Sequence, residues 1–217
     1  MQKELDMPNP WLNIPASDYE SHMGLPEVRQ LEFLSEVFKN SIEIYDSSEI
    51  AYLGAATGNG LEFISNEVTK RVTAIDINSE YLDILAKRYQ DKINGLKVIE
   101  ADLIDYESQN EAYTLIFAGL LFEYLSPNDL LHKIRFWLKK SGVLVVVLQL
   151  DDKNHNKISV TPYTSLNQLS SIMNLVSITQ FQSLAQQNGL FEFECNRVIL
   201  DSGKEFYIGA YKLSSNI

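Results

Sequence analysis

The sequence predicts a doubly wound α/β fold: a mostly parallel seven-stranded sheet, helices on both faces and an antiparallel hairpin at the C-terminal edge. Up to residue 150, five strand-like segments alternate with segments of helix length, which is typical of βαβ units. Beyond that point, strand candidates at 191–200 and 204–213 flank the tripeptide Asp-Ser-Gly, and such a connection predicts a hairpin.

The parallel strands are short apolar segments bounded by polar or glycine residues. The run VLVVVL at 143–148 suits a strand that is buried on both faces, and it is far too short to cross a bilayer. The five strands are expected at 49–55, 71–76, 96–102, 113–119 and 143–150.

Helices are expected where apolar residues recur every three or four positions and where capping residues mark an end. Asn78 or Ser79 can cap a helix that continues to Tyr89, and Lys139-Lys140 are expected to close another helix before Gly142. Apart from the helix that ends at Tyr89, helical segments are expected at 24–40, 60–68, 126–142 and 177–190, and Lys139-Lys140 belong to the third of these.

We expect one domain across residues 1–217, because the chain can bury a sizeable core by itself. Within it, 1–44 supplies an N-terminal arm and helix that could act as a lid. Residues 45–150 form the ligand-binding half, 151–176 a connection that could cap a substrate, and 177–217 the last helix and the hairpin.

Composition excludes several classes of protein. The net charge of −11 and the pI of about 4.7 disfavour binding to nucleic acid. Cys195 is the single cysteine, so neither an intramolecular disulfide nor a cysteine-based zinc site is available, and no metal is expected. The N-terminus lacks the apolar run of a signal peptide, and we expect a cytoplasmic protein without a membrane partner, either a monomer or a homodimer.

The segment IAYLGAATGNG at 50–60 predicts a strand that runs into a ligand-binding loop. In a doubly wound sheet, ligands bind beyond the carboxyl ends of the strands, and Gly54 ends the first strand. Gly58 and Gly60 permit tight turning and a close approach of backbone to ligand. A helix starting near 60 would add free N–H groups. Alternatively, the glycines only form a turn.

Two carboxylates end the next two strands in the order that a nucleoside site requires. Asp76 ends the second strand, where a carboxylate can accept hydrogen bonds from both ribose hydroxyls. Asp102 ends the third strand, within reach of an adenine. Either residue could instead cap a helix or a turn. The frame that begins at Gly54 lacks the second glycine of G-x-G-x-x-G, which disfavours a nicotinamide oxidoreductase.

Taken together, these motifs resemble the class I S-adenosylmethionine-dependent methyltransferases, with their Rossmann-like sheet and antiparallel edge hairpin. The resemblance covers roughly 45–213 and is nearest the type 11/12-like branch that acts on small molecules. It rests on YLGAATG (52–58), Asp76-Ile77, EADLIDY (100–106), YTLIFAGLLFEYL (113–125) and LKKSGVLVVV (138–147).

The resemblance implies methyl transfer from S-adenosylmethionine to a small-molecule acceptor, with S-adenosylhomocysteine as product. It also implies which positions contact the cofactor, because they match the family's motifs or, for Tyr19, the N-terminal arm that often folds over the cofactor. The expected cofactor-binding residues are Tyr19, Gly54, Ala55, Ala56, Gly58, Asp76, Ile77, Asp102, Leu103, Ala118 and Gly119.

Three positions depart from the family's pattern. Tyr52 replaces the first-motif carboxylate that holds the methionine ammonium, Ala56 replaces the middle glycine, and Thr114 replaces the usual aspartate of the fourth-strand motif. Losing the carboxylate removes a charge-assisted contact. We therefore expect a modified cradle that still binds, and the alternative is a non-catalytic protein that binds the nucleoside.

The catalytic base is not identified by any motif. His22 is a candidate because imidazole titrates near neutrality and this residue lies on the expected lid. Tyr19 and Tyr124 are further candidates, and each of the three could instead be a structural residue. The acceptor pocket is expected between the N-terminal arm, 118–124 and 151–176, but no motif identifies the acceptor.

Overall fold

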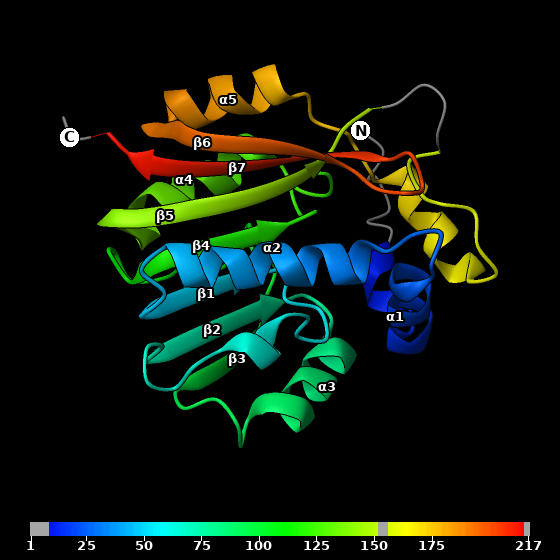
Figure 1. Cartoon of the computed structure of the whole chain (residues 1–217), viewed down its shortest axis with the longest axis horizontal. Helices are drawn as coiled ribbons and strands as arrows, with labels where there is room; N and C mark the ends of the chain where they lie inside the picture. The colour runs from blue at the N-terminus through cyan, green and yellow to red at the C-terminus, as the bar shows by residue number, and fades with distance from the viewer. Residues whose placement is uncertain (1–8, 152–155, 215–217) are drawn as a thin grey trace, which may run out of the picture.

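The computed structural model describes residues 9–151 and 156–214, so short parts of the expected N-terminal arm and of the 151–176 connection lie outside the described residues. One seven-stranded sheet forms the centre of the molecule, in the order β3-β2-β1-β4-β5-β7-β6 (Figure 1). The strands are β1 Glu49–Leu53, β2 Arg71–Asp76, β3 Leu96–Glu100, β4 Tyr113–Gly119, β5 Leu138–Gln149, β6 Leu190–Ile199 and β7 Glu205–Leu213.

The topology confirms the fold that the sequence predicts. Strands β1 to β5 pair in parallel, whereas β7 pairs antiparallel with both β5 and β6. Strand order reverses between β1 and β4, and this switch point is where open α/β sheets bind ligands. The strand positions that the apolar segments indicate are all confirmed: the ends agree or differ by one or two residues, except at the start of β5, where the difference is larger.

Helices cover the two faces of the sheet. The α-helices are α1 Ala16–Gly24, α2 Gln30–Ile44, α3 Ser79–Tyr89, α4 Pro127–Trp137 and α5 Ile178–Gln187. Three 3-10 turns, η1 Pro10–Asn13, η2 Leu61–Phe63 and η3 Thr164–Ser171, complete the described structure. Helix α2 lies in front of β1 and β4 (Figure 1). Helices α4 and α5 pack together on the other face of the sheet.

Alternation along the strands divides the core into two clusters. In β4, Leu115 and Phe117 face the cluster that contains Phe38 of α2, whereas Ile116 faces the cluster that contains Trp137 of α4. Successive side chains of a strand point to opposite faces, so a strand buried on both sides must be apolar throughout. This requirement explains why β4 and β5 were readily found in the sequence.

The helix expected at 60–68 is absent. After Gly60 the chain makes only the 3-10 turn η2 and then irregular turns. Polar side chains supply hydrogen bonds that compete with a helix: Ser65 Oγ accepts from Glu67 N–H, while Asn66 accepts from Asn94 N–H and donates to Lys92 O. The glycine loop is therefore not followed by a helix that could bind a ligand at its N-terminus.

The boundary between α4 and β5 also differs from the prediction. Helix α4 ends at Trp137, and β5 begins at Leu138, so Lys139-Lys140 lie in the strand and do not close the helix. Leu138 is buried and pairs with Tyr113, and the Lys139 ammonium forms an ion pair with Glu49. The register of β4 and β5 shifts after this pair. The pairing of β5 with β4 therefore outweighs the tendency of the two lysines to end a helix.

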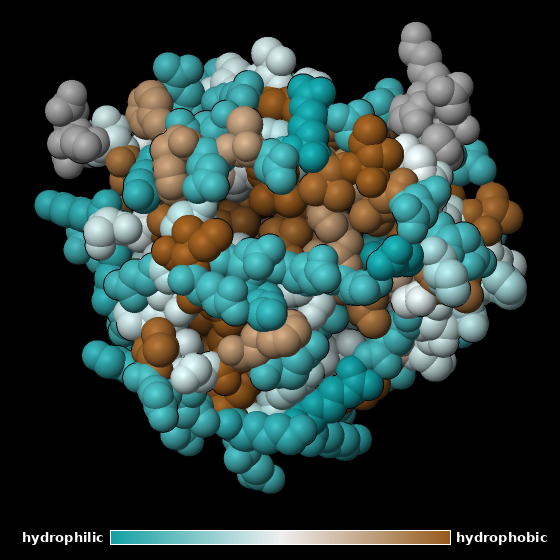
Figure 2. Space-filling view, in the orientation of Figure 1, coloured by the Kyte–Doolittle hydropathy of each residue, from teal (hydrophilic) through white to brown (hydrophobic). Residues whose placement is uncertain are grey.

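Helix α2 leaves part of the sheet face uncovered. Figure 2 shows hydrophobic side chains gathered beside α2, over the β5–β7 part of the sheet. A groove on this face is lined by Val37 and Ile44 of α2 and by Ile208 and Ala210 of β7. Within residues 9–151 and 156–214, no helix is long and apolar enough to cross a membrane.

Candidate functional site

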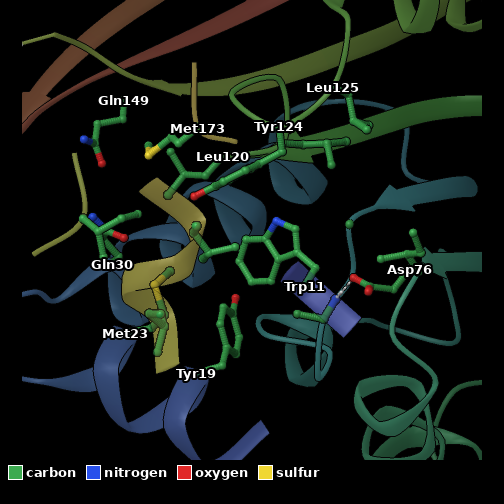
Figure 3. A pocket seen from close by; sticks show the side chains of 18 of the residues that line it. Trp11, Tyr19, Met23, Gln30, Asp76, Leu120, Tyr124, Leu125, Gln149 and Met173 are labelled. Atoms are coloured by element: carbon green, nitrogen blue, oxygen red, sulfur yellow. Dashed lines mark hydrogen bonds between the residues drawn. The ribbon is translucent and has the colours of Figure 1, made fainter. Parts of the chain in front are cut away.

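A cavity of about 130 Å³ opens at the carboxyl ends of the central strands. Asp76 marks one end, and Gln30 and Gln149 lie together at the other, with Trp11 and Tyr19 between them (Figure 3). The walls come from α1, α2, the loop after β1, the ends of β2, β4 and β5, and the connection that contains η3. Parallel strands bring these distant segments to one edge of the sheet.

The loop after β1 makes the turn at which the sequence predicts a cradle. Gly54 has φ +63°, Gly58 +88° and Gly60 +86°, and all three lie in the left-handed region that favours glycine. A Cβ at position 58 would lie 2.9 Å from side-chain atoms of α3, so Gly58 packs against that helix and does not line the cavity. Gly54 does line it.

Ala56, which occupies the place of the middle glycine in the first motif, adopts φ +44°. The left-handed conformation costs an L-residue about 1–2 kcal/mol. Here it turns the Ala56 N–H toward the Asp76 carboxylate, which accepts this hydrogen bond at 2.8 Å (Figure 3). The strained residue therefore joins the glycine loop to the end of β2, and both residues line the cavity.

Asp76 is held by backbone donors on several sides. Its Oδ1 atom accepts from Asn78 N–H at 2.9 Å, while Oδ2 accepts from Ala56. Burial raises the pKa of the Asp76 carboxyl, although the N–H groups of Asn78, Ala56 and Ile77 act in the opposite direction. Ile77 lines the cavity beside it. A carboxylate fixed in this way retains lone pairs for the hydroxyl groups of a ligand.

The end of β3 contributes the second predicted carboxylate. Asp102 and Leu103 both line the cavity, and Asp102 Oδ1 also accepts from Ile104 N–H at 2.8 Å. Gly119 of β4 reaches the cavity as well, whereas Ala55 and Ala118 are fully buried behind its wall. Most of the predicted cofactor residues therefore line the cavity. The three that do not are Ala55, Gly58 and Ala118, which pack behind the lining residues.

Tyr52 lies away from the cavity, in the core beneath the loop. Its ring stacks on Phe38 with centroids 5.0 Å apart and meets Phe117 edge-on. Its hydroxyl donates to Asn59 O at 2.9 Å. This hydrogen bond ties the far end of the glycine loop to β1. The third departure, Thr114, lies at the start of β4, where its hydroxyl bridges to the backbone of Glu49.

Aromatic rings form the central wall of the cavity. Tyr19 of α1 stacks on Tyr81 of α3 with centroids 5.3 Å apart, and Trp11 meets Tyr19 and Tyr124 edge-on at 6.1 and 5.1 Å. Sequence reasoning missed Trp11, which is held because the Asn78 side chain donates to its carbonyl at 2.8 Å. A tryptophan within the expected arm was the available signal.

Helix α1 is fastened to the loop that it covers. Thr57 Oγ1 donates to Glu20 at 2.5 Å, and Arg88 of α3 forms an ion pair with the same carboxylate. On its other side, Asp18 accepts from Ser165 of η3 at 2.6 Å. The expected arm is therefore a helix joined to the core at two places. It forms a wall of the cavity.

The end of the cavity remote from Asp76 is polar. His22 is buried, and its Nδ1 atom lies 2.9 Å from Thr161 Oγ1. Burial, followed by the positive charge of Lys204, lowers the pKa of the His22 imidazole. Gln149 and Lys204 are also buried and line this end. All three candidate bases, His22, Tyr19 and Tyr124, thus lie at the cavity.

Glu123 is a buried acid immediately behind this polar end. Its Oε1 atom accepts from Gln149 N–H at 2.7 Å, and its Oε2 atom has no partner among the described residues. Burial raises the pKa of the Glu123 carboxyl to about 7, although the Gln149 N–H opposes this effect. Its own carbonyl accepts from Asn174 N–H at 2.7 Å, which anchors the segment after η3.

Residues 50–142 match a family described as a methyltransferase domain. Among curated proteins, (S)-coclaurine N-methyltransferase of Papaver somniferum is 29% identical over 114 residues, which are 51% of this chain and 32% of that protein. The chain thus spans about a third of the length of the curated relative that it matches.

Solved structures share the fold across most of the chain. Phosphoethanolamine N-methyltransferase 2 of Haemonchus contortus, in complex with phosphomonomethylethanolamine and S-adenosylhomocysteine, has a TM-score of 0.71 at 12% identity. The match covers 92% of this chain and 57% of that one. The [4+2]-cyclase SpnF has a TM-score of 0.65 at 11% identity, covering 83% and 80%. The resemblance to class I S-adenosylmethionine-dependent methyltransferases is therefore confirmed, together with their Rossmann-like fold.

The variant Ala56→Gly is expected to raise the free energy of unfolding by about 1 kcal/mol, because glycine adopts the left-handed conformation without the Cβ penalty. The measurement is urea unfolding followed by circular dichroism. Ala55→Gly is the matched control: Ala55 is fully buried and is not among the residues with positive φ, so its replacement should destabilise the protein. Equal losses in the two variants would contradict the strain at position 56.

The variant Glu123→Gln is expected to stabilise the protein at pH 8 by about 2–3 kcal/mol and to change little at pH 4.5. Its folded pKa of about 7 exceeds the ordinary value of 4.5, so the stability that the bound proton provides is complete below pH 4.5 and is lost as pH rises through 7. Urea unfolding at both pH values checks this. The exposed Glu67→Gln is the control, and a gain independent of pH would refute the argument.

Proposed function

We propose that this chain transfers a methyl group from S-adenosylmethionine to a small-molecule acceptor. One observation carries the proposal: a single cavity joins the Asp76 end, which suits a nucleoside, to a separate polar end that contains His22. A donor and an acceptor could thus meet inside one enclosure. The methyltransferase family match and the shared fold support this assignment.

The residues present fit this cofactor. Asp76 offers a carboxylate for the ribose hydroxyls, Asp102 and Leu103 form a wall for the adenine, and Gly54 lets the backbone approach the methionine part. When bound, S-adenosylmethionine supplies an electrophilic methyl group on a sulfonium. Because Tyr52 points into the core, the described residues offer no first-motif carboxylate for the ammonium group, so its contacts must come from backbone or from the aromatic wall.

The chain itself contributes position and the exclusion of water. Trp11, Tyr19 and Tyr124 make an apolar enclosure between the two ends of the cavity, and α1 is fixed across it by Glu20. Holding two reactants in line can supply much of the acceleration of a displacement reaction, and a dry site strengthens the electrostatic contacts within it. An obvious base is therefore not essential to the proposal.

We propose His22 as the group that accepts a proton from the acceptor. Its imidazole is buried at the polar end, and its lowered pKa keeps it neutral, and thus basic, at pH 7. Thr161 fixes one ring nitrogen and so orients the other. Tyr19 and Tyr124 are weaker candidates, because burial raises the pKa of both hydroxyls and makes them poorer proton acceptors at neutral pH.

Several companion features belong to the same proposal. We infer that the chain works as one domain, in the cytoplasm, as a monomer or homodimer, and without nucleic acid; the net charge of −11 supports the last point. A second candidate function, binding of the nucleoside without catalysis, is favoured by Tyr52 and Ala56. Release of S-adenosylhomocysteine with any acceptor would eliminate that second candidate.

Asp76→Ala is expected to weaken binding of S-adenosylmethionine and S-adenosylhomocysteine roughly 10- to 150-fold, because it removes hydrogen bonds to a charged acceptor that are together worth about 1.5–3 kcal/mol. Isothermal titration measures the affinities, with NAD as a ligand that should not bind. Asp83→Ala, an exposed change on α3, is the matched control. An unchanged affinity in a folded Asp76→Ala variant would refute the placement of the ribose.

His22→Asn is expected to lower kcat roughly 100-fold, the lower range for loss of a general base. In the wild type, the rate should fall as pH drops through the folded pKa of His22, which lies below the ordinary 6.5, because protonation removes the base. The variant should lack this acidic limb, and the exposed His132→Asn should retain it. A variant that keeps the limb would assign the proton transfer to another group.

A further inference from the structure

The polar end of the cavity contains a buried cation that has no partner of opposite charge among the described residues. Lys204, in the turn between β6 and β7, is only 5% exposed, yet it lines the cavity. Its ammonium donates to Lys157 O at 2.9 Å, and no carboxylate among the described residues forms an ion pair with it. Buried lysines are rare unless they are paired.

Burying an ammonium disfavours its charged form, and this lowers the pKa of Lys204. Burial lowers the pKa of the Lys204 ammonium to about 8, which still leaves it largely protonated at pH 7. An ammonium has three donors, and one of them is used by the Lys157 carbonyl. The other two donors have no acceptor among the described residues, and Lys204 lines the cavity.

The neighbours of Lys204 are donors and neutral groups. Gln149 Nε2 donates to the same Lys157 carbonyl at 2.9 Å, which places the amide beside the ammonium. Burial, followed by the charge of Lys204, lowers the pKa of the His22 imidazole, and Gln30 lies across from Gln149 (Figure 3). The acid Glu123 lies behind the wall and does not line the cavity.

Charge is therefore divided along the cavity. The carboxylates Asp76 and Asp102 line the end that suits a nucleoside, while the buried Lys204 lies at the other end. Lys157 also lines the cavity, and its ammonium donates to Met173 O at 2.8 Å. Beside these polar groups, η3 and its flank contribute the apolar side chains of Leu166, Leu169 and Met173 to the cavity wall. A group bound there would meet hydrocarbon on its body and an ammonium at its tip.

We propose that Lys204, with the Gln149 amide beside it, is an anion subsite that selects acceptors carrying a carboxylate or a phosphate monoester on an apolar body. This inference rests on the proposed methyl transfer and names its substrate class. The anion would provide the counter-charge that Lys204 lacks, and a charge-assisted hydrogen bond in a dry site is worth more than one in water. Neutral analogues would leave the ammonium unpaired.

The test compares isosteric probes in the presence of saturating S-adenosylhomocysteine. Benzoate, phenyl phosphate and the neutral benzamide are each titrated into the protein by isothermal calorimetry, and their affinities are compared. The two anions distinguish a carboxylate site from a phosphate site. We expect at least one anion to bind the wild type roughly tenfold or more tightly than benzamide. Lys204→Met should abolish this preference, and Lys204→Arg should retain it.

The controls separate a subsite from a structural role. Lys212→Met, an exposed change on β7, should keep the preference, and the affinity of Lys204→Met for S-adenosylhomocysteine should equal that of the wild type. No preference in the wild type, or the same preference in Lys204→Met, would overturn the proposal.

The proposed function can fail separately. If S-adenosylhomocysteine does not bind but a Lys204-dependent preference for anions remains when the probes are titrated alone, the subsite stands and the methyl-transfer assignment falls. If S-adenosylhomocysteine binds and the anions show no preference, the assignment stands and the subsite falls.

Discussion

The hydrogen bond from Ala56 N–H to the Asp76 carboxylate is the contact on which the architecture of the site depends. It joins the loop after β1 to the end of β2, across a distance in sequence of 20 residues. To make it, the chain must turn into the left-handed region at Gly54 and again at Ala56. Together with the hydrogen bond from Ala55 N–H to Ile75 O at 3.0 Å, this contact fixes the loop relative to the strand that ends at Asp76.

The loop is secured without the helix that usually follows such a turn, and this explains the departure at Tyr52. A carboxylate there would face the stacked ring of Phe38 in the core, whereas the tyrosine fills that space and its hydroxyl holds Asn59 O. Thr57 is held in addition through Glu20. Side-chain hydrogen bonds thus hold the loop in place of a following helix. Tyr52, which replaces a ligand-binding carboxylate in the motif, stabilises the loop from the core.

The sequence predicts the sheet and the residues at strand ends well, because continuous apolar segments and parallel topology determine both. Asp76 and Asp102 were found for this reason. Trp11 and Lys204 were not, since the contacts that place them, to Asn78 and Lys157, span 67 and 47 residues and arise only in the folded chain. The helix expected at 60–68 failed because the side-chain contacts of Asn66 with the loop before β3 outweighed a weak helical tendency.

The shared fold alone does not select a reaction, since a [4+2]-cyclase has it as well as methyltransferases. What distinguishes this chain is the interior of its cavity. Helix α1 is fixed by Glu20 to the glycine loop and by Asp18 to η3, so contacts within the chain hold the wall between the two ends in place. Little ordering is then required on binding, and selectivity must come from the groups at each end. Under the proposed function, the opposite charges of Asp76 and Lys204 would orient the two ligands, because each ligand would pair its own polar group with one end of the cavity.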